Sequence, residues 1–241
     1  MMTTLPPLAL AAEDISVNYG HVQALTDVSI TVRHGRIRAL IGTNGSGKST
    51  LFKALMGLEQ PHSGRIINAH PEPGAVAYVP QSEAVDWNFP LSVHDVVASG
   101  RMAGRHGRWF RRLSAKDREI VDSALERTGL TDFRFRQIGQ LSGGQKKRAF
   151  VARGLAQQAQ VMLLDEPFAG VDTTNQTQIT ALLREMAADG TAMLVSTHDL
   201  ARLDELADDV TLLGRTVIAE GGVDEVLTPG NLVTAFGGVP C

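Results

Sequence analysis

The chain has 241 residues, with 23 basic against 26 acidic side chains and a formal net charge of -3 at pH 7. This length suits one sizeable α/β core with a helical insertion and is too short for two full domains of average size. The near balance of charge argues against a general attraction to nucleic acid, so we expect no nucleic-acid partner.

The only cysteine is Cys241, the final residue. An intrachain disulfide and a zinc site built on several thiolates are therefore not expected, and a reducing compartment is the simplest interpretation. The N-terminal residues lack a basic stretch followed by a long apolar one, and no run approaches the roughly 18–20 apolar residues that span a bilayer. We expect any membrane role to depend on a partner protein.

The first segment, Leu8 to Val32, alternates apolar and polar residues with a period of two. This alternation predicts a small layer of half-buried antiparallel strands. A short apolar run at Ile37 to Ile41 then leads into a glycine-rich loop and a helix. The apolar side of this helix is predicted to carry Leu51, Phe52, Leu55 and Leu58.

The glycine-rich loop reads Gly42-Thr43-Asn44-Gly45-Ser46-Gly47-Lys48-Ser49 and matches the P-loop pattern. Its glycines permit positive φ, so that backbone N–H groups and the following helix N-terminus can bind phosphate. Lys48 supplies a positive charge for the β- and γ-phosphates, Ser49 is placed to bind Mg²⁺, and Thr50 supports the α-phosphate side. The flanking strand and helix favour this interpretation over a chance glycine-rich turn, and ATP and Mg²⁺ are the predicted ligands.

Between Gln81 and Gln140 the composition changes, and helical signals replace β-branched runs. Ser114-Ala115-Lys116-Asp117 has the spacing of a capping box, which predicts a helix start before Ile120. Leu141-Ser142-Gly143-Gly144-Gln145 also predicts a helix start, with a Ser142 hydroxyl and exposed glycine N–H groups that suit a second anion-binding terminus. We interpret this region as a helical subdomain inserted into the core.

Two continuous apolar runs, Val161 to Leu164 and Ala192 to Val195, predict buried parallel strands. The helix between them carries Ile179, Leu182, Leu183 and Met186. The last thirty residues predict a short strand pair and a terminal helix.

Asp165 and Glu166 directly follow the first of these strands, at the edge where open α/β sheets place their ligands. We predict that Asp165 holds the Mg²⁺ shell and that Glu166 polarises the water that attacks the γ-phosphate. The alternative for Glu166 is a helix-capping acid. His198 follows the second strand and is predicted to reach the γ-phosphate from the same edge, the alternative being a structural histidine.

The other six histidines, including His62 and His70, show no spacing typical of a metal site. We expect them on the surface.

The Leu141–Gln145 motif lies about a hundred residues after the P-loop and shortly before Asp165-Glu166, an order that resembles the ATP-binding cassette (ABC) family. The resemblance covers nearly the whole chain. It implies an α/β P-loop NTPase core with a parallel sheet, an N-terminal antiparallel β layer and an inserted helical subdomain. The implied division is a core of residues 1–81 and 156–241 and a helical subdomain of residues 82–155.

The same resemblance implies roles for further residues. Gln81 corresponds to the Q-loop glutamine that contacts Mg²⁺, Asp172 to the D-loop acid, and His198 to the switch histidine. Tyr19 lies where family members stack an aromatic ring on adenine, with core packing as the alternative. The signature residues Ser142, Gly143, Gly144 and Gln145 are implied to close over ATP held by a second copy of the chain in a head-to-tail dimer.

Departures from the family pattern are mild. Thr43 replaces a commoner Pro or Ala, Lys146-Lys147-Arg148 replaces a glutamine-rich sequence, and Val171 stands where Leu is frequent. None removes a group that contacts phosphate or water, so a competent ATPase is expected.

Three segments resemble importers of manganese, zinc and iron ions: Asp86 to Val93, Trp109 to Arg112, and Arg136 to Gln140. The implied function is the energy-coupling subunit at the cytoplasmic face of the membrane, held there by a permease and served indirectly by an extracellular solute-binding protein. Manganese is the first expected cargo, with zinc or iron next. A metal chelate remains an alternative cargo.

A soluble ABC ATPase of DNA repair or of the ribosome is the main alternative function. Repair proteins of this kind insert long coiled coils and ribosomal ones carry two cassettes, and neither feature is present. A P-loop kinase or GTPase would leave Gln81, His198 and the Leu141–Gln145 motif unexplained.

The segment after Gln81 also suggests where a permease binds. Trp87 and Phe89 are predicted apolar anchors for a coupling helix of the permease, the alternative being that both pack inside the helical subdomain. A predicted basic patch faces lipid headgroups, the permease or solvent. It consists of Arg101, Arg105, Arg108, Arg111 and Arg112.

Overall fold

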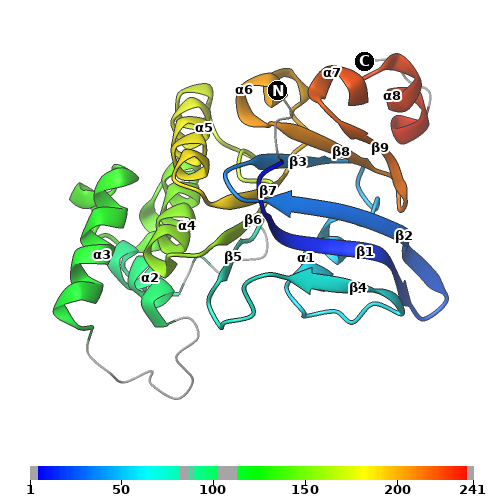
Figure 1. The fold of residues 1–241 in the computed structure, drawn as a ribbon. Coiled ribbons are helices and arrows are strands. Elements are labelled where there is room, and N and C mark those ends of the chain that lie inside the picture. Colours follow the sequence, from blue (N-terminus) through cyan, green and yellow to red (C-terminus); the bar gives the residue numbers. More distant parts are fainter. Residues whose placement is uncertain (1–4, 82–86, 88, 103–112, 238–241) are drawn as a thin grey trace. The chain divides into compact units, whose positions relative to one another are not determined.

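The structure of the protein is a computed structural model, drawn as a ribbon in Figure 1. The structure describes residues 5–81, 87, 89–102 and 113–237. The chain forms two compact units. Unit 1 comprises residues 1–70 and 186–241, and unit 2 comprises residues 71–185.

Unit 1 contains the antiparallel β layer that the alternating N-terminal sequence predicts. Strand β1 (Leu8–Tyr19) lies between β2 (Val22–Arg33) and β4 (Ser63–Asn68) and is antiparallel to both. Burial alternates along β2 from Val28 to Val32, as the period of two predicts, whereas β1 buries the consecutive residues 9–12.

A second sheet in unit 1 has strand β3 (Ile37–Ile41) at its centre. Strands β7 (Ala192–Ser196) and β8 (Asp209–Leu213) flank β3 and are parallel to it, and β9 (Val217–Gly221) adds to β8 in the antiparallel direction. All five residues of β7 are buried, as the continuous apolar run predicts.

Short helices pack against β3 and β8 around a buried cluster that includes Ile41, Leu203, Val210, Leu212 and Val226 (Figure 1). They are η5 (Leu200–Arg202), α6 (Leu203–Leu206), α7 (Val223–Val226) and α8 (Pro229–Phe236).

Helix α1 (Lys48–Leu55) follows the glycine-rich loop and buries Leu51, Phe52 and Leu55. The prediction that Leu58 lies on the same apolar side was wrong. The helix ends at Leu55, Gly57 takes a φ of 71°, and the chain turns so that Leu58 is 73% exposed.

Unit 2 combines a parallel strand pair with a group of helices. Strand β5 (Val76–Val79) pairs with β6 (Val161–Asp165), and α5 (Thr173–Ala188) begins in this unit. The remaining elements are α2 (Val93–Ser99), η2 (Gly100–Met102), α3 (Ala115–Arg127), η3 (Thr131–Phe133), η4 (Ile138–Gln140) and α4 (Gly143–Gln157).

Helices α2, α3 and α4 share an apolar core that includes Val97, Val121, Leu125, Leu130 and Ala152. Capping boxes begin all three helices, at Ser92, Ser114 and Ser142, and those at Ser114 and Ser142 confirm the helix starts predicted there. The division of the chain at residues 82–155 differs from the boundaries of unit 2 and stays a prediction.

Each unit brings the carboxyl ends of two parallel strands to one edge. In unit 1, Leu40 of β3 is in register with Ser196 of β7, so the glycine-rich loop and His198 follow neighbouring strand ends. In unit 2, Val79 is in register with Leu164, so Gln81 and Glu166 follow neighbouring strand ends. Open α/β sheets bind ligands at such edges.

Among the described residues, no helix has both the length and the apolar character needed to cross a bilayer.

His70 was expected to be an exposed surface residue, and this prediction was wrong. Its side chain is half-buried, and its ring contacts the ring of His34.

Candidate functional site

The glycine-rich loop of unit 1 requires glycine at several positions. Gly45 and Gly47 have φ values of 83° and 100°, in the left-handed region that favours glycine. Gly47 also caps α1, and a Cβ atom there would lie 2.8 Å from the Ala24 carbonyl oxygen. At Gly42 a Cβ atom would collide with the backbone of Leu213. The loop therefore packs closely against neighbouring backbone, and only glycine fits at these positions.

Lys48 lies within this loop and is 8% exposed. Its Nζ donates hydrogen bonds to the carbonyl oxygens of Gly42 at 2.7 Å and Thr43 at 3.1 Å. The positive charge is thus held where phosphate oxygens meet a P-loop. The next residues of α1 are Ser49, which is exposed, and Thr50, which is half-buried.

The Ser46 hydroxyl is a direct sign that the loop is built for a ligand. Its Oγ is buried, and the described part of the chain gives it no hydrogen-bond partner. Leaving such a group unpaired costs about 1–3 kcal/mol. A phosphate oxygen bound in the loop removes this cost, so the loop fits the phosphates of a nucleotide.

The other two candidates in unit 1 are accessible to a ligand. His198 follows β7 and is exposed, and the preceding Thr197 is anchored by an N–H donated to the Leu40 carbonyl at 3.2 Å. Tyr19, at the end of β1, is 43% exposed, which argues against the alternative of core packing.

In unit 2, Asp165 is 4% exposed, and its carboxylate accepts a hydrogen bond from the Tyr78 hydroxyl at 3.3 Å. Burial, with the charge of Asp165 and this hydrogen bond, raises the pKa of Tyr78 to about 12. The hydroxyl therefore keeps its proton at neutral pH and acts as a donor that orients Asp165. Sequence reasoning missed Tyr78, although it stands on β5 three residues before Gln81.

Glu166 and Gln81 come together at the edge of the β5 and β6 pair. Gln81 Nε2 donates to Glu166 Oε2 at 3.4 Å. Glu166 has a φ of 49°, an uncommon conformation for a residue other than glycine that costs about 1–3 kcal/mol and persists only where the surroundings enforce it. Its carboxylate direction is therefore set by backbone geometry as well as by Gln81.

Lys147 on α4 holds this backbone in place. It is 2% exposed, and its Nζ donates to the Glu166 carbonyl oxygen at 3.0 Å. Burial lowers the pKa of Lys147, while the charges of Asp165 and Glu166 partly offset that effect. The sequence offered no signal for this contact beyond the unusual Lys146-Lys147-Arg148 segment.

We expect Lys147→Met to lower the kcat of ATP hydrolysis about 10-fold with little change in KM, because the hydrogen bond that fixes Glu166 is lost, a loss of about 1.4 kcal/mol. Lys147→Gln, which keeps a donor, should retain more of the rate. Steady-state phosphate release checks this. Lys146→Met, at the neighbouring lysine, serves as the control, and an equal loss of kcat there would contradict a specific role for Lys147.

The predicted signature motif begins α4 with reciprocal hydrogen bonds. The Ser142 hydroxyl accepts from the Gln145 N–H at 3.3 Å, and Gln145 Oε1 accepts from the Ser142 N–H at 2.9 Å. A Cβ atom on Gly144 would lie 2.8 Å from Asn175 Cγ. Gln145 therefore stabilises the start of α4. Because Gly144 has no side chain, the start of α4 can lie close to Asn175 at the start of α5.

Asp172 stands at the beginning of α5 and is bound to Asn175. Its carboxylate accepts from the Asn175 backbone N–H at 3.0 Å and from Nδ2 at 2.6 Å. The backbone and side-chain hydrogen bonds of Asn175 hold the pKa of Asp172 below its usual value. Asn175 was not among the sequence candidates, and it links the signature helix start to Asp172 within unit 2.

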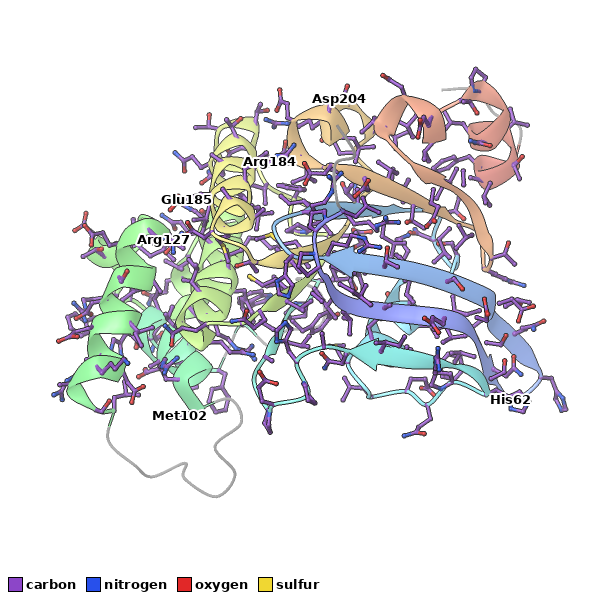
Figure 2. All side chains as sticks on the ribbon, in the orientation of Figure 1. His62, Met102, Arg127, Arg184, Glu185 and Asp204 are labelled. Atoms are coloured by element: carbon purple, nitrogen blue, oxygen red, sulfur yellow. The ribbon has the colours of Figure 1, made fainter. Side chains whose placement is uncertain are left out.

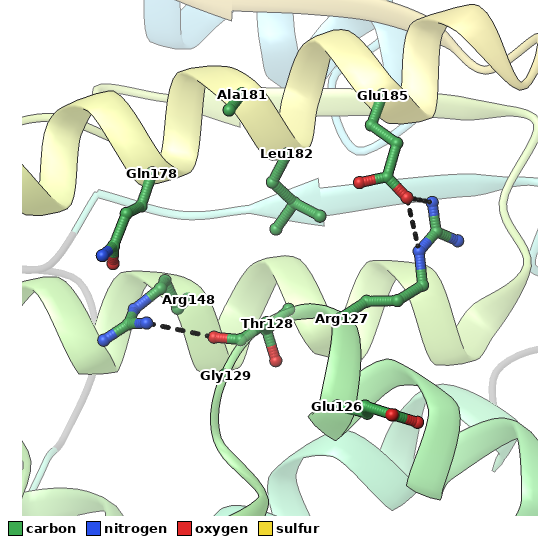
Figure 3. A pocket seen from close by; sticks show the side chains of 9 residues that line it. All are labelled: Glu126, Arg127, Thr128, Gly129, Arg148, Gln178, Ala181, Leu182 and Glu185. Atoms are coloured by element: carbon green, nitrogen blue, oxygen red, sulfur yellow. Dashed lines mark hydrogen bonds and ion pairs between the residues drawn. The ribbon is translucent and has the colours of Figure 1, made fainter.

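A pocket of about 420 Å³ in unit 2, shown in Figure 3, contains none of the predicted site residues. Its arginines are engaged: Arg127 pairs with Glu185 at 2.8 Å, and Arg148 donates to the Thr128 carbonyl at 3.2 Å.

The predicted anchors Trp87 and Phe89 differ in their surroundings. Trp87 packs against the helical core and meets Phe150 edge to face with ring centres 5.6 Å apart. Phe89 is 60% exposed. The packing alternative thus describes Trp87, whereas Phe89 is available to a partner.

Arg101 was predicted in an exposed basic patch, but it forms an ion pair with the buried Asp117 at 2.9 Å and donates to the Ala156 carbonyl at 2.8 Å. It is a structural residue. The other four arginines of that patch lie outside the described residues. The same holds for Asp86, Asn88, Trp109 and Phe110, which belong to the segments that resemble metal-ion importers.

The chain is similar to known proteins along nearly its whole length. A family model described as ABC transporter matches residues 25–169. The manganese transport system ATP-binding protein MntA of Synechocystis sp. is 48% identical, with 100% of this chain and 94% of that protein covered. The chelated iron transport system membrane protein YfeB of Yersinia pestis is 47% identical, with coverage of 97% and 80%.

A solved structure of an inward-facing, metal-chelate type ABC transporter superposes with a TM-score of 0.84 at 29% identity, and the match covers 95% of this chain and 89% of that one. This likeness confirms the α/β P-loop NTPase fold that the sequence predicted. Because the family model spans more than half of the chain and the relatives align along nearly all of it, the chain belongs to the ABC transporter family, as an ATP-binding subunit that hydrolyses ATP.

Proposed function

We propose that this chain is the energy-coupling ATPase of a membrane importer for a divalent metal ion, with manganese as the first candidate cargo and zinc or iron next. The names of MntA and YfeB support a metal cargo. The observation that carries the nucleotide part of the proposal is the buried Ser46 hydroxyl, which has no hydrogen-bond partner among the described residues, in the loop that also holds Lys48.

The proposed nucleotide contacts follow from the loop. Residues 42–50 bind the phosphates of ATP, with Lys48 at the β- and γ-phosphates, and Tyr19 stacks on adenine. Ser49, Gln81 and Asp165 offer hydroxyl, amide and carboxylate oxygens, the donor set that Mg²⁺ prefers. When bound there, Mg²⁺ neutralises charge on the phosphate oxygens.

Glu166 is the proposed general base, and His198 the proposed contact to the γ-phosphate. Glu166 carries the carboxylate, and the Gln81 and Lys147 hydrogen bonds fix its position. The Tyr78 hydroxyl donates to Asp165, the proposed Mg²⁺ ligand, and orients its carboxylate.

The active unit is proposed to be a head-to-tail dimer of two copies. Ser142 and Gly143 are exposed at the start of α4, where the helix dipole favours an anion. In this arrangement the Ser142–Gln145 terminus and Asp172 of one copy complete the ATP site of the other. ATP then controls dimer closure.

The permease is proposed to bind at the segment that leads into α2. Phe89 is 60% exposed and Leu91 is 37% exposed, and both stand close in sequence to Gln81, so binding there is coupled to the nucleotide site. The chain then sits at the cytoplasmic face of the membrane, and an extracellular solute-binding protein delivers cargo to the permease.

Phe89→Ala should reduce stimulation of ATP hydrolysis by the permease about 10-fold, because truncation of a buried interface aromatic costs about 1–2 kcal/mol or more. Basal hydrolysis should stay unchanged. The measurement is ATPase activity with and without the permease in vesicles. Leu58→Ala, a truncation of a 73% exposed apolar side chain in unit 1, is the control, and equal loss of basal activity in Phe89→Ala would favour a packing role.

The cargo is tested in vesicles that contain the chain and its co-purified permease, with the binding protein loaded with one metal at a time. Manganese-loaded binding protein should stimulate hydrolysis and ⁵⁴Mn uptake most strongly. Stronger stimulation by zinc or by a chelated iron would reassign the cargo, and hydrolysis that responds to none of them would contradict an importer of metal ions.

A further inference from the structure

Two histidines that are far apart in the sequence meet ring to ring in unit 1. His34 lies in the turn between β2 and β3, and His70 follows the end of β4. Their Nε2 atoms are 2.8 Å apart, their ring centres are 5.0 Å apart, and the rings stand at 90° to each other. Both side chains are half-buried.

The protonation of His34 follows from its second contact. His34 Nδ1 lies 3.0 Å from the Gly190 carbonyl oxygen, and a carbonyl oxygen only accepts, so Nδ1 carries the proton. In the neutral ring the lone pair is then on Nε2, the atom that faces His70. Metal-binding histidines show this arrangement, in which the other ring N–H donates to a carbonyl or carboxylate.

The backbone at both histidines is held in place before any ligand binds. The Gly190 carbonyl also accepts from the Gly35 N–H at 3.2 Å, and the His34 N–H donates to the Pro7 carbonyl at 3.0 Å. On the other side, the His70 N–H donates to Asn68 Oδ1 at 2.9 Å. A preformed pair avoids the entropy cost of ordering two side chains on binding.

We propose that His34 and His70 bind a divalent transition metal of the Zn²⁺ class through their two Nε2 atoms, with solvent completing a tetrahedral shell. With metal–nitrogen bonds of about 2.0–2.1 Å, a tetrahedral ion places the two nitrogens about 3.3 Å apart and the ring centres about 5.2 Å apart. The observed ring centres already lie 5.0 Å apart. The rings therefore need only to tilt in place, which opens the Nε2 separation from 2.8 Å by about half an ångström.

The proton balance of binding is simple. The Nε2 proton of His70 that now lies between the rings moves, through solvent, to Nδ1 of the same ring, so that both Nε2 lone pairs face the metal.

The ligand set also defines selectivity. Imidazole nitrogen suits Zn²⁺ and related ions, whereas Mn²⁺ prefers oxygen donors.

The affinity of the proposed site is limited by its number of protein ligands. Within the described ranges, no group of three or more His, Cys, Asp or Glu side chains is arranged to hold a metal, so two protein ligands give a site of modest affinity. None of the proposed nucleotide contacts takes part, and the site does not depend on the proposed cargo.

The test is Zn²⁺ binding by the full-length, nucleotide-free protein at pH 7.5, measured by calorimetry in a Cys241→Ser background that removes the only thiol. His70→Ala and His34→Asn should each lose one equivalent of bound Zn²⁺, and the double variant should lose the same single equivalent. Mn²⁺ should bind the parent at least about 10-fold more weakly than Zn²⁺. Saturating Zn²⁺ should raise the melting temperature of the parent but not of either single variant.

His62→Ala is the matched control, because His62 is an exposed histidine at the other end of β4 (Figure 2). It should bind as much Zn²⁺ as the parent. His70→Gln guards against a folding defect, since it preserves a hydrogen-bonding side chain and removes the imidazole. Undiminished Zn²⁺ binding by a folded His70→Gln protein, or an equal loss in His62→Ala, would show that the two rings share only a hydrogen bond.

Discussion

Glu166→Gln is expected to bind ATP with nearly normal affinity and to lower kcat by about 100- to 10,000-fold, the range of a lost general base. The amide keeps the size of the carboxylate but cannot take a proton from water. The backbone contact from Lys147 Nζ to the Glu166 carbonyl is untouched by the change, so the loop geometry should persist. Malachite green assays of phosphate release and ATP binding by calorimetry separate these two effects.

The same variant tests the proposed dimer. If ATP closes two copies together and hydrolysis separates them, an enzyme that binds ATP without cleaving it should accumulate as a dimer. Light scattering should then show a monomer without nucleotide and a dimer with ATP and Mg²⁺. Glu126→Gln, at an exposed glutamate of unit 2, should hydrolyse ATP normally and show no lasting dimer.

Two results would contradict this account in different ways. An unchanged hydrolysis rate in Glu166→Gln would remove Glu166 from the role of general base. Slow hydrolysis without an ATP-dependent dimer would keep that role and reject the head-to-tail arrangement.

The predictions that succeeded rest on local sequence patterns. The helix start at Ser142 needs only a hydroxyl and a glutamine three residues later, and both hydrogen bonds of that pair are present. Strands β6 and β7 are fully buried, and full burial produces the continuous apolar runs that identified them. Such features lie within a few neighbouring residues and are therefore visible in a single sequence.

The contacts that were missed join residues that are distant along the chain. Tyr78 and Asp165 are 87 positions apart, His34 and His70 are 36 apart, and Lys147 and the Glu166 carbonyl are 19 apart. Each depends on which strands and helices become neighbours after folding, and periodicity carries no information about that. The Lys147 contact also ends on a backbone oxygen, which residue identity does not encode.

The two anchors at 87 and 89 show a further limit. Both are large aromatic residues in the same segment, but only Trp87 finds Phe150 and the helical core, while Phe89 stays 60% exposed. The sequence alone does not distinguish a buried aromatic residue from an exposed one in this segment. The difference arises because Trp87 packs against Phe150 of α4.

Lys48→Ala should weaken ATP binding about 10- to 100-fold, because a hydrogen bond to a charged group contributes about 1.5–3 kcal/mol. The loss has two sources in this structure. Lys48 Nζ is proposed to supply charge for the phosphates, and it also donates to the carbonyl oxygens of Gly42 and Thr43, contacts that hold the loop together. The variant therefore removes a ligand contact and a loop contact at once.

Thermal unfolding separates these two sources. A lower melting temperature without nucleotide reports the lost contacts to Gly42 and Thr43, whereas a smaller rise on addition of ATP reports the lost phosphate contact. Lys53→Ala, at an exposed lysine of the same helix, should change neither quantity. A normal ATP-induced rise in Lys48→Ala would mean that the loop binds phosphate through its backbone alone, and Lys48 would then be a structural brace of the P-loop.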